Sequence, residues 1–317
     1  MTARRAVVIR SSQNVCGAFC PSLKLDRMHG TGGARKAGRS ILRGREHRTT
    51  RTRLAAALAV VVFAAVAFSR CAGTTPTATT GHSYGTGVKT INDGKLTIGA
   101  DTAFPPFETM SGTIAEGFDV DLAAAIAKHL GLTSEFRSEK FDTLIPQLKA
   151  GGKFDVIMSA MTITAERKKE IDFSDAYIDS NLAVAVRKGS TIRRDADLAG
   201  KKVGVQSGTT GETWAKENIK GATIIPFDDT LVAFAALRAG RVAGIINDLP
   251  VTAFIVRNPE RDAEIVQEIP TGEQYGIGVS KESSELLNAL NDALASVTRS
   301  GEYARIYRKW FSAEPPV

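Results

Sequence analysis

Cysteine and histidine are scarce in this chain of 317 residues. The three cysteines are Cys16, Cys20 and Cys71, so the rest of the chain contains no thiol for a disulfide or a thiolate metal site. Only two of the four histidines, His82 and His129, follow residue 71. Because zinc sites and Ser/His/Asp triads depend on such side chains, we predict no metal, no cofactor and no catalytic residue.

The folded part also lacks the positive charge that the pI of about 9.3 suggests. Residues 1–71 hold 14 Lys and Arg and 2 Asp and Glu, which leaves 27 basic and 32 acidic residues after them. The basic excess therefore lies in the N-terminal segment, and nucleic acid is not a predicted partner.

Long hydrophobic runs are limited to one, from Leu54 to Phe68. It has the length of a secretory signal and is short for a membrane span, although a transmembrane anchor is the alternative. We predict that 1–71 is a basic leader and export signal, followed by a flexible Thr/Gly/Ser/Pro tether over 72–92. Phe68-Ser69-Arg70-Cys71 resembles a bacterial lipobox, except that Arg70 replaces a small residue. Lipidation of Cys71 would anchor the exported protein to the membrane.

Short β-rich runs alternate with helical patterns from residue 95 onward. This alternation predicts an α/β fold with parallel sheets flanked by helices, arranged as two hinged lobes around a cleft. We place lobe 1 at 93–178 and 276–317 and lobe 2 at 179–275, with the hinge near 177–182 and 272–276. Ligands of such sheets bind beyond the carboxyl ends of the strands, so the segments that follow strands are the candidate site.

Two such segments belong to the first lobe. Asp101 follows strand 96–100 and lies three residues before Phe104, so an acid and a ring could face the cleft; a turn with Phe104 in the core is the alternative. Phe141 could add a second ring that encloses a small ligand. Arg167 follows strand 155–158, and its guanidinium can bind a carboxylate in bidentate geometry, unless it is an ordinary surface arginine.

Two further segments belong to the second lobe. The turn from Gln206 to Glu212 leaves backbone N–H groups free at a helix start, where they could bind an anion; it lacks the Lys of a phosphate loop, and an ordinary capped helix is the alternative. Asp248 follows strand 243–246 and could bind an ammonium group or simply cap the next helix, with Pro250 in its first turn.

Together these segments resemble the polar-amino-acid-binding proteins of bacterial ABC importers, solute-binding family 3, and most of all its glutamine-binding members. The resemblance covers roughly residues 93–313. It rests on the order and spacing of short stretches: Asp101-Thr102-Ala103-Phe104, Gly117-Phe118-Asp119-Val120-Asp121-Leu122, Thr162-Ile163-Thr164, Glu166-Arg167-Lys168-Lys169, Ile171-Asp172-Phe173-Ser174, Gln274-Tyr275-Gly276-Ile277 and Ile306-Tyr307-Arg308-Lys309-Trp310-Phe311.

The resemblance implies a role for each site residue. Groups for the ligand α-carboxylate and α-ammonium would be the Arg167 guanidinium, the Thr162 hydroxyl, the backbone at Thr210, the Ala160 carbonyl and the Asp248 carboxylate. Groups around the ligand side chain would be Phe104, Phe141, Asp101, Gln206 and Asn247. The last two replace a lysine and a histidine of the glutamine binders. Asp101 would then remain as a spare negative charge, which favours glutamine or a cationic amino acid over glutamate or aspartate.

The implied function is that of an extracytoplasmic protein that closes on a free polar amino acid and delivers it to ABC permease subunits. We do not expect an enzyme. The alternatives are a cyclohexadienyl or arogenate dehydratase on the same fold, and a ligand-sensing subunit that works with a separate receptor chain.

Overall fold

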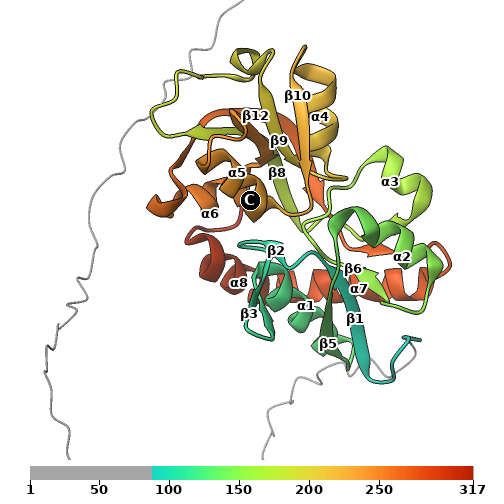
Figure 1. Ribbon diagram of the computed structural model, residues 1–317. Coiled ribbons are helices and arrows are strands. Elements are labelled where there is room, and N and C mark those ends of the chain that lie inside the picture. Colours follow the sequence, from blue (N-terminus) through green and yellow to red (C-terminus); the bar gives the residue numbers. More distant parts are fainter. Residues whose placement is uncertain (1–87, 317) are drawn as a thin grey trace, which may run out of the picture. The chain divides into compact units, whose positions relative to one another are not determined.

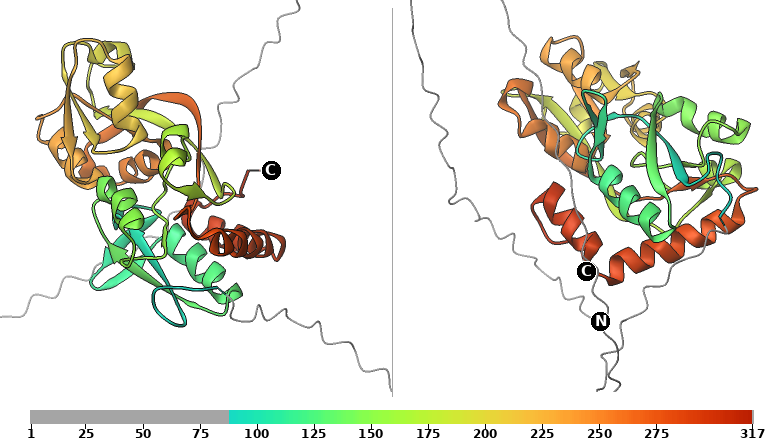
Figure 2. Two further views of the ribbon diagram at one scale, coloured as in Figure 1. Left: turned by 90° about the vertical axis from the view of Figure 1, so that its right-hand side faces the viewer. Right: turned by 90° about the horizontal axis from the view of Figure 1, so that it is seen from below.

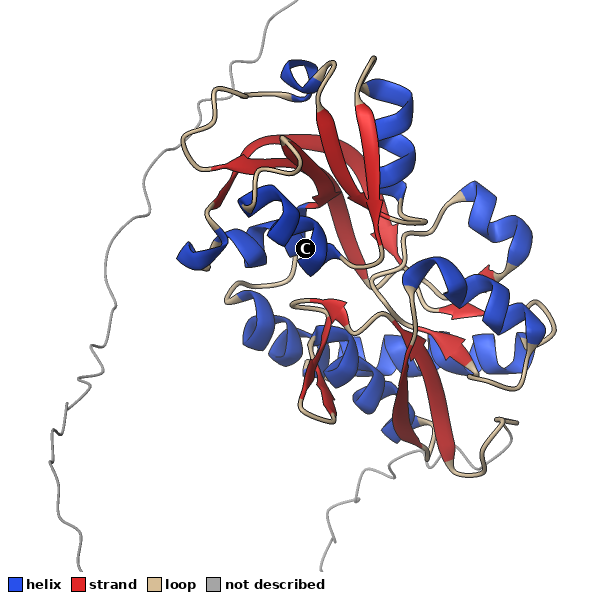
Figure 3. Ribbon diagram, viewed as in Figure 1, coloured by secondary structure: helices blue, strands red, loops and turns tan. Residues whose placement is uncertain are grey.

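The structure is a computed structural model that describes residues 88–316. The predicted leader, Cys71 and most of the predicted tether lie outside this range. The strands of the described residues form two five-stranded sheets and one three-stranded sheet, with helices packed against both large sheets (Figures 1 and 3). We call the part around the first large sheet lobe 1 and the part around the second lobe 2.

The lobe 1 sheet has the strand order β5-β1-β6-β13-β7. Strand β1, which lies between β5 and β6, is buried along all but its first residue, as expected for a strand covered on both faces. The strands are β1 (Lys95–Ala100), β5 (Thr133–Ser138), β6 (Val156–Ile157), β7 (Asp172–Phe173) and β13 (Gly278–Val279). Strand β13 comes from the end of the chain, so lobe 1 is discontinuous in sequence.

The lobe 2 sheet has the order β10-β9-β11-β8-β12. Its strands are β8 (Ile178–Arg187), β9 (Lys202–Gln206), β10 (Thr223–Phe227), β11 (Gly244–Asp248) and β12 (Ala263–Tyr275). The long strands β8 and β12 pair from Ala263 to Tyr275 and continue to the junction with lobe 1. The predicted crossings near 177–182 and 272–276 fall at the ends of these two strands. The lobe boundaries stay a prediction.

Both sheets are mixed rather than purely parallel. Strand β1 is parallel to β5 and β6, and β9 is parallel to β10 and β11, as predicted. In contrast, β13 is antiparallel to β6 and β7, and β8 is antiparallel to β11 and β12. Parallel neighbours need a long crossover connection, whereas β8 and β13 enter their sheets directly from the junction between the lobes.

The α-helices of the described residues divide between the two lobes. Those of lobe 1 are α1 (Phe118–His129), α2 (Leu144–Ala150), α3 (Ala165–Glu170), α7 (Ser284–Arg299) and α8 (Glu302–Phe311). Those of lobe 2 are α4 (Thr210–Asn218), α5 (Thr230–Arg238) and α6 (Leu249–Val256). Side chains at fixed spacing explain the packing of α7 against α1 (Figure 2): Leu286, Leu290 and Leu294 repeat every four residues and are buried on one face. Burial of each such leucine stabilises the folded protein by about 1.5–3 kcal/mol.

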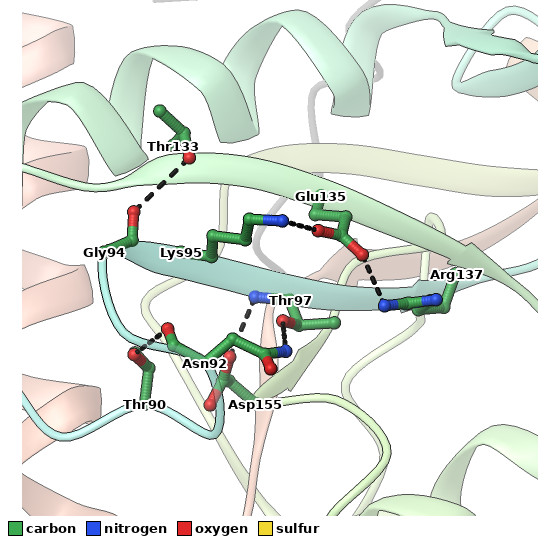
Figure 4. A network of polar contacts seen from close by, with 9 residues as sticks. All are labelled: Thr90, Asn92, Gly94, Lys95, Thr97, Thr133, Glu135, Arg137 and Asp155. Atoms are coloured by element: carbon green, nitrogen blue, oxygen red, sulfur yellow. Dashed lines mark hydrogen bonds and ion pairs between the residues drawn. The ribbon is translucent and has the colours of Figure 1, made fainter.

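A small sheet that the sequence did not predict lies between β1 and α1. It consists of β2 (Ala103–Phe104), β3 (Glu108–Ser111) and β4 (Ile114–Glu116). Asp155 fixes the start of β1, the end opposite to Asp101. It accepts a hydrogen bond from the Thr97 N–H at 2.8 Å (Figure 4). It also accepts one from the Ile91 N–H at 2.7 Å. Because β1 is fixed there and along its length, its carboxyl end presents Asp101 in a defined place.

Among residues 88–316, no helix combines the length and the apolar character that crossing a bilayer requires.

Candidate functional site

The predicted residues of the two lobes meet at the carboxyl ends of their strands. Asp101 follows β1, while Gln206 and Asp248 end β9 and β11. Hydrogen bonds at the predicted residues cross from lobe to lobe: Gln206 Nε2 donates to Asp101 Oδ2, and Arg167 Nη2 donates to the Gly208 carbonyl at 3.0 Å. The site is therefore built from both sheets.

Arg167 is not an ordinary surface arginine. Helix α3 begins at Thr164, whose hydroxyl accepts the Arg167 N–H at 3.1 Å and so sets the direction of the side chain. The guanidinium donates to the Thr162 carbonyl at 2.7 Å and lies 5.2 Å from the centre of the Phe141 ring. Burial lowers the pKa of Arg167, while the charges of Asp248 and Glu273 raise it.

Asp248 does not cap helix α6 with its side chain, although it occupies the N-cap position. Asp248 is 4% exposed, and its carboxylate accepts a hydrogen bond from the Tyr275 hydroxyl. Burial, followed by repulsion from Glu273, raises the pKa of Asp248 to about 7, while the Tyr275 hydrogen bond and Arg167 act in the opposite direction. The charges of Arg167 and Asp248 thus act on each other.

Asp101 and Gln206 form a second group at this junction. Burial raises the pKa of Asp101 to about 6, and the hydrogen bond from Gln206 lowers it. Gln206 Oε1 also accepts a hydrogen bond from the Thr230 hydroxyl at 2.9 Å. The same hydroxyl lies 3.2 Å from Asn247 Oδ1. The Asn247 amide donates to the Thr252 hydroxyl at 3.3 Å. Asn247 is therefore connected to Gln206 through the Thr230 hydroxyl.

The remaining predicted residues surround these two groups. Phe104 is 6% exposed and packs on Phe107 with ring centres 6.4 Å apart, which fits the core alternative as well as a cleft wall. Thr162 is buried, and Ala160 adopts a left-handed backbone conformation with φ of 44°. Thr210 is the first residue of α4, which is capped by the Thr209 side chain.

Gly208 explains how the turn before α4 can approach lobe 1. Its φ of +76° favours glycine, and a Cβ there would lie 2.9 Å from the Cβ of Asp142 in the 3₁₀ turn at Phe141–Thr143. Any larger residue would push the lobes apart at this contact.

Glu273 is a functional candidate that the sequence reasoning missed. Its Oε2 lies 3.5 Å from the Thr162 hydroxyl, and its pKa is raised by burial and lowered by a hydrogen bond from Thr210 and by the charge of Arg167. From β12 of lobe 2 it therefore reaches Thr162 of lobe 1, and it is near enough to Arg167 for that charge to lower its pKa. Had 263–275 been predicted as a strand, the period of two would have placed Glu273 and Tyr275 on the same face.

Known proteins are similar to this chain over most of its described residues. The family model of bacterial extracellular solute-binding proteins, family 3, matches residues 96–313. The L-cystine-binding protein TcyJ of Escherichia coli strain K12 is 33% identical over 225 residues, which cover 70% of this chain and 84% of that protein.

Two solved structures are also similar. An ancestral arginine-binding protein bound to arginine is 45% identical, with a TM-score of 0.66 over 69% of this chain and 98% of that one. An ancestral arginine-binding protein bound to glutamine is 44% identical, with a TM-score of 0.65 over 69% of this chain and 99% of that one. The fold, with its site between two lobes, is that of a solute-binding protein. This chain belongs to family 3 of the bacterial extracellular solute-binding proteins.

Proposed function

We propose that this protein captures glutamine or a cationic amino acid by closing its lobes, and delivers the ligand to an ABC permease. One observation supports the proposal: Arg167 of lobe 1 and Asp248 of lobe 2 are near enough that the charge of each shifts the pKa of the other. A free amino acid carries a carboxylate and an ammonium on one carbon, and these two side chains have the complementary charges. Only a ligand that contacts both lobes favours the closed state.

The remaining charges select the ligand side chain. If Arg167 and Asp248 neutralise the zwitterion, Asp101 and Glu273 remain as acids at the site. A cationic side chain can pair with Asp101, and a glutamine amide can donate a hydrogen bond to it. An acidic side chain would meet repulsion of about 4 kcal/mol for unit charges 4 Å apart at an intermediate dielectric constant.

The first test is a thermal-shift screen of the purified protein against the twenty amino acids. A ligand that binds the folded protein alone raises its stability by RT ln(1 + [L]/Kd). We expect the largest shifts with glutamine, arginine, lysine or histidine. If none of the twenty shifts the transition, amino-acid binding is wrong, and incubation with arogenate or prephenate then tests the dehydratase alternative.

Replacing Asp101 with asparagine should change selectivity more than affinity. The substitution keeps a group that can accept the hydrogen bond from Gln206 but removes the charge that faces a cationic side chain. We expect affinity for arginine to fall about tenfold or more and affinity for glutamine to change less. Calorimetry with both ligands measures the ratio, and an unchanged ratio would place the ligand side chain elsewhere.

Binding should weaken in mild acid. The ligand ammonium needs ionised Asp248, whose pKa in the free protein is about 7, so each complex formed below that pH must release a proton. For a single group of this pKa we expect a loss of roughly 30-fold in affinity between pH 8 and pH 5.5. Calorimetric titrations across this range should show it, and a flat profile would contradict the role of Asp248.

We further propose that the protein works at the outer face of the cell membrane and is anchored there through Cys71. The basic and apolar leader and its cysteine support this location. Metabolic labelling with a fatty acid tests it: label should enter the wild-type protein and not Cys71→Ser.

A further inference from the structure

Two completely buried carboxyl groups are connected by hydrogen bonds to the backbone of the candidate site. Glu108 begins β3 and Asp119 lies in the first turn of α1, and both are 0% exposed. Gly117 makes their approach possible: with φ of +151° it lets the start of α1 run so close to Phe107 that a Cβ there would lie 1.9 Å from its carbonyl oxygen. The Asp119 N–H in turn donates to that carbonyl at 2.9 Å.

Each acid holds a backbone segment that faces the proposed ligand. Asp119 Oδ2 accepts the Ala160 N–H at 2.8 Å, and Ala160 is a non-glycine residue in the left-handed region. Glu108 Oε1 accepts the Ser159 hydroxyl at 2.7 Å, and Ser159 Oγ accepts the Asp101 N–H at 2.9 Å. Backbone at the ends of both β1 and β6 is thus connected to this one pair of acids.

The hydrogen bonding of the pair requires a proton. Within the described part of the chain, no N–H or O–H donor reaches Glu108 Oε2 or Asp119 Oδ1, and the Asp119 charge is close enough to raise the pKa of Glu108. The charges acting on Glu108 come from Asp119 and Asp101, both acidic. Two adjacent buried carboxylates without a cation cannot both ionise, and one shared proton satisfies both of the remaining oxygens.

The proton belongs on Glu108. Asp119 Oδ2 accepts two hydrogen bonds, from Ala160 and from the Tyr177 hydroxyl at 2.8 Å, which favours its ionised form. Glu108 accepts only one, from Ser159. Burial and the neighbouring Asp119 charge raise the pKa of Glu108 well above its usual range, while burial raises that of Asp119 to about 6.

We propose that protonated Glu108 and ionised Asp119 act as one hydrogen-bonded unit that positions the backbone at Asp101 and Ala160 for amino-acid binding. They are positioning residues, because neither faces the ligand itself. The positioning role rests on the proposed function, whereas the shared proton does not. Glutamine at position 108 can reproduce the protonated acid, since its amide donates to Asp119 and its carbonyl accepts from Ser159.

The test compares Glu108→Gln with Glu108→Met, which has similar volume but no hydrogen bond. Circular dichroism and cooperative unfolding establish that each variant folds. By calorimetry, we expect Glu108→Gln to retain affinity within about threefold and Glu108→Met to lose about tenfold or more. Exposed Glu116 on β4 supplies the control, Glu116→Gln, which should bind as wild type does. Equal affinity of Glu108→Met and wild type would overturn the positioning role.

Infrared spectroscopy at pH 8.5 locates the proton independently of any ligand. We expect the carbonyl band of a protonated carboxyl group in wild type and Glu116→Gln, and its loss in Glu108→Gln. Absence of the band from wild type would overturn the shared proton.

If Glu108→Met does not fold, Ser159→Ala takes its place in the binding test. This variant leaves the pair intact but removes the hydroxyl that accepts the Asp101 N–H, and it must lower affinity. A protein that binds no amino acid fails the proposed function, while the infrared result still decides the pair.

Discussion

Replacing Arg167 with alanine is expected to lower the affinity for the amino acid by about 2–5 kcal/mol, or roughly 30- to 5,000-fold in Kd. The ligand carboxylate would lie in a desolvated site without its ionic partner. The guanidinium also donates to Thr162 and Gly208, so it connects the lobes as well as binding the ligand. Calorimetry with the amino acid selected by thermal shift gives the Kd.

Two further variants separate these contributions. Arg167→Lys keeps the charge but cannot form two parallel hydrogen bonds, so its loss should be intermediate. Lys168→Ala removes the same charge from the next, exposed position of α3 and should bind as wild type does. Near-normal affinity in Arg167→Ala would show that the ligand carboxylate binds elsewhere.

Replacing Asp248 with asparagine should weaken binding and stabilise the free protein at the same time. The ion pair with the ligand ammonium is lost, which we expect to cost about 1.5–3 kcal/mol of binding energy. The folded-state pKa of about 7 lies above the usual value of 3.8, so ionising Asp248 costs stability progressively as the pH rises from about 4 to about 7. At pH 8 the uncharged variant avoids this cost, and we expect a gain of about 1–4 kcal/mol.

Denaturant unfolding at pH 8 measures the stability and calorimetry measures the binding. Opposite signs are typical of a residue kept for function at the expense of stability. Glu217→Gln removes an exposed charge from α4 of the same lobe and should change neither quantity. If Asp248→Asn lost stability and kept its affinity, Asp248 would be a structural residue.

Much of the fold could be predicted because local patterns determine it. Leu122 and Ile126 are spaced for one face of a helix, and α1 buries both against the core. The small sheet was missed because its strands have two to four residues, which is too short for a period of two to be recognised. Strand β12 was missed because its core-facing residues, Ile269 and Tyr275, are separated by polar residues and by a register shift.

The candidate site was predictable in part for a different reason. Arg167 and Asp248 follow strands, and the rule that ligands bind at strand ends selects them. Local spacing could not show that Glu273 approaches Thr162, because 111 residues separate them in sequence. Likewise the partnership of Glu108 with Asp119 depends on the close turn at Gly117, and the pattern of the sequence alone does not indicate which buried acids meet.

The most direct measurement is a crystal structure of the protein with the amino acid that gives the largest thermal shift. We predict closed lobes, with the α-carboxylate hydrogen-bonded to the Arg167 guanidinium and the α-ammonium within about 3 Å of the Asp248 carboxylate. A bound amino acid that touches neither side chain, or that contacts one lobe only, would contradict the proposed capture mechanism.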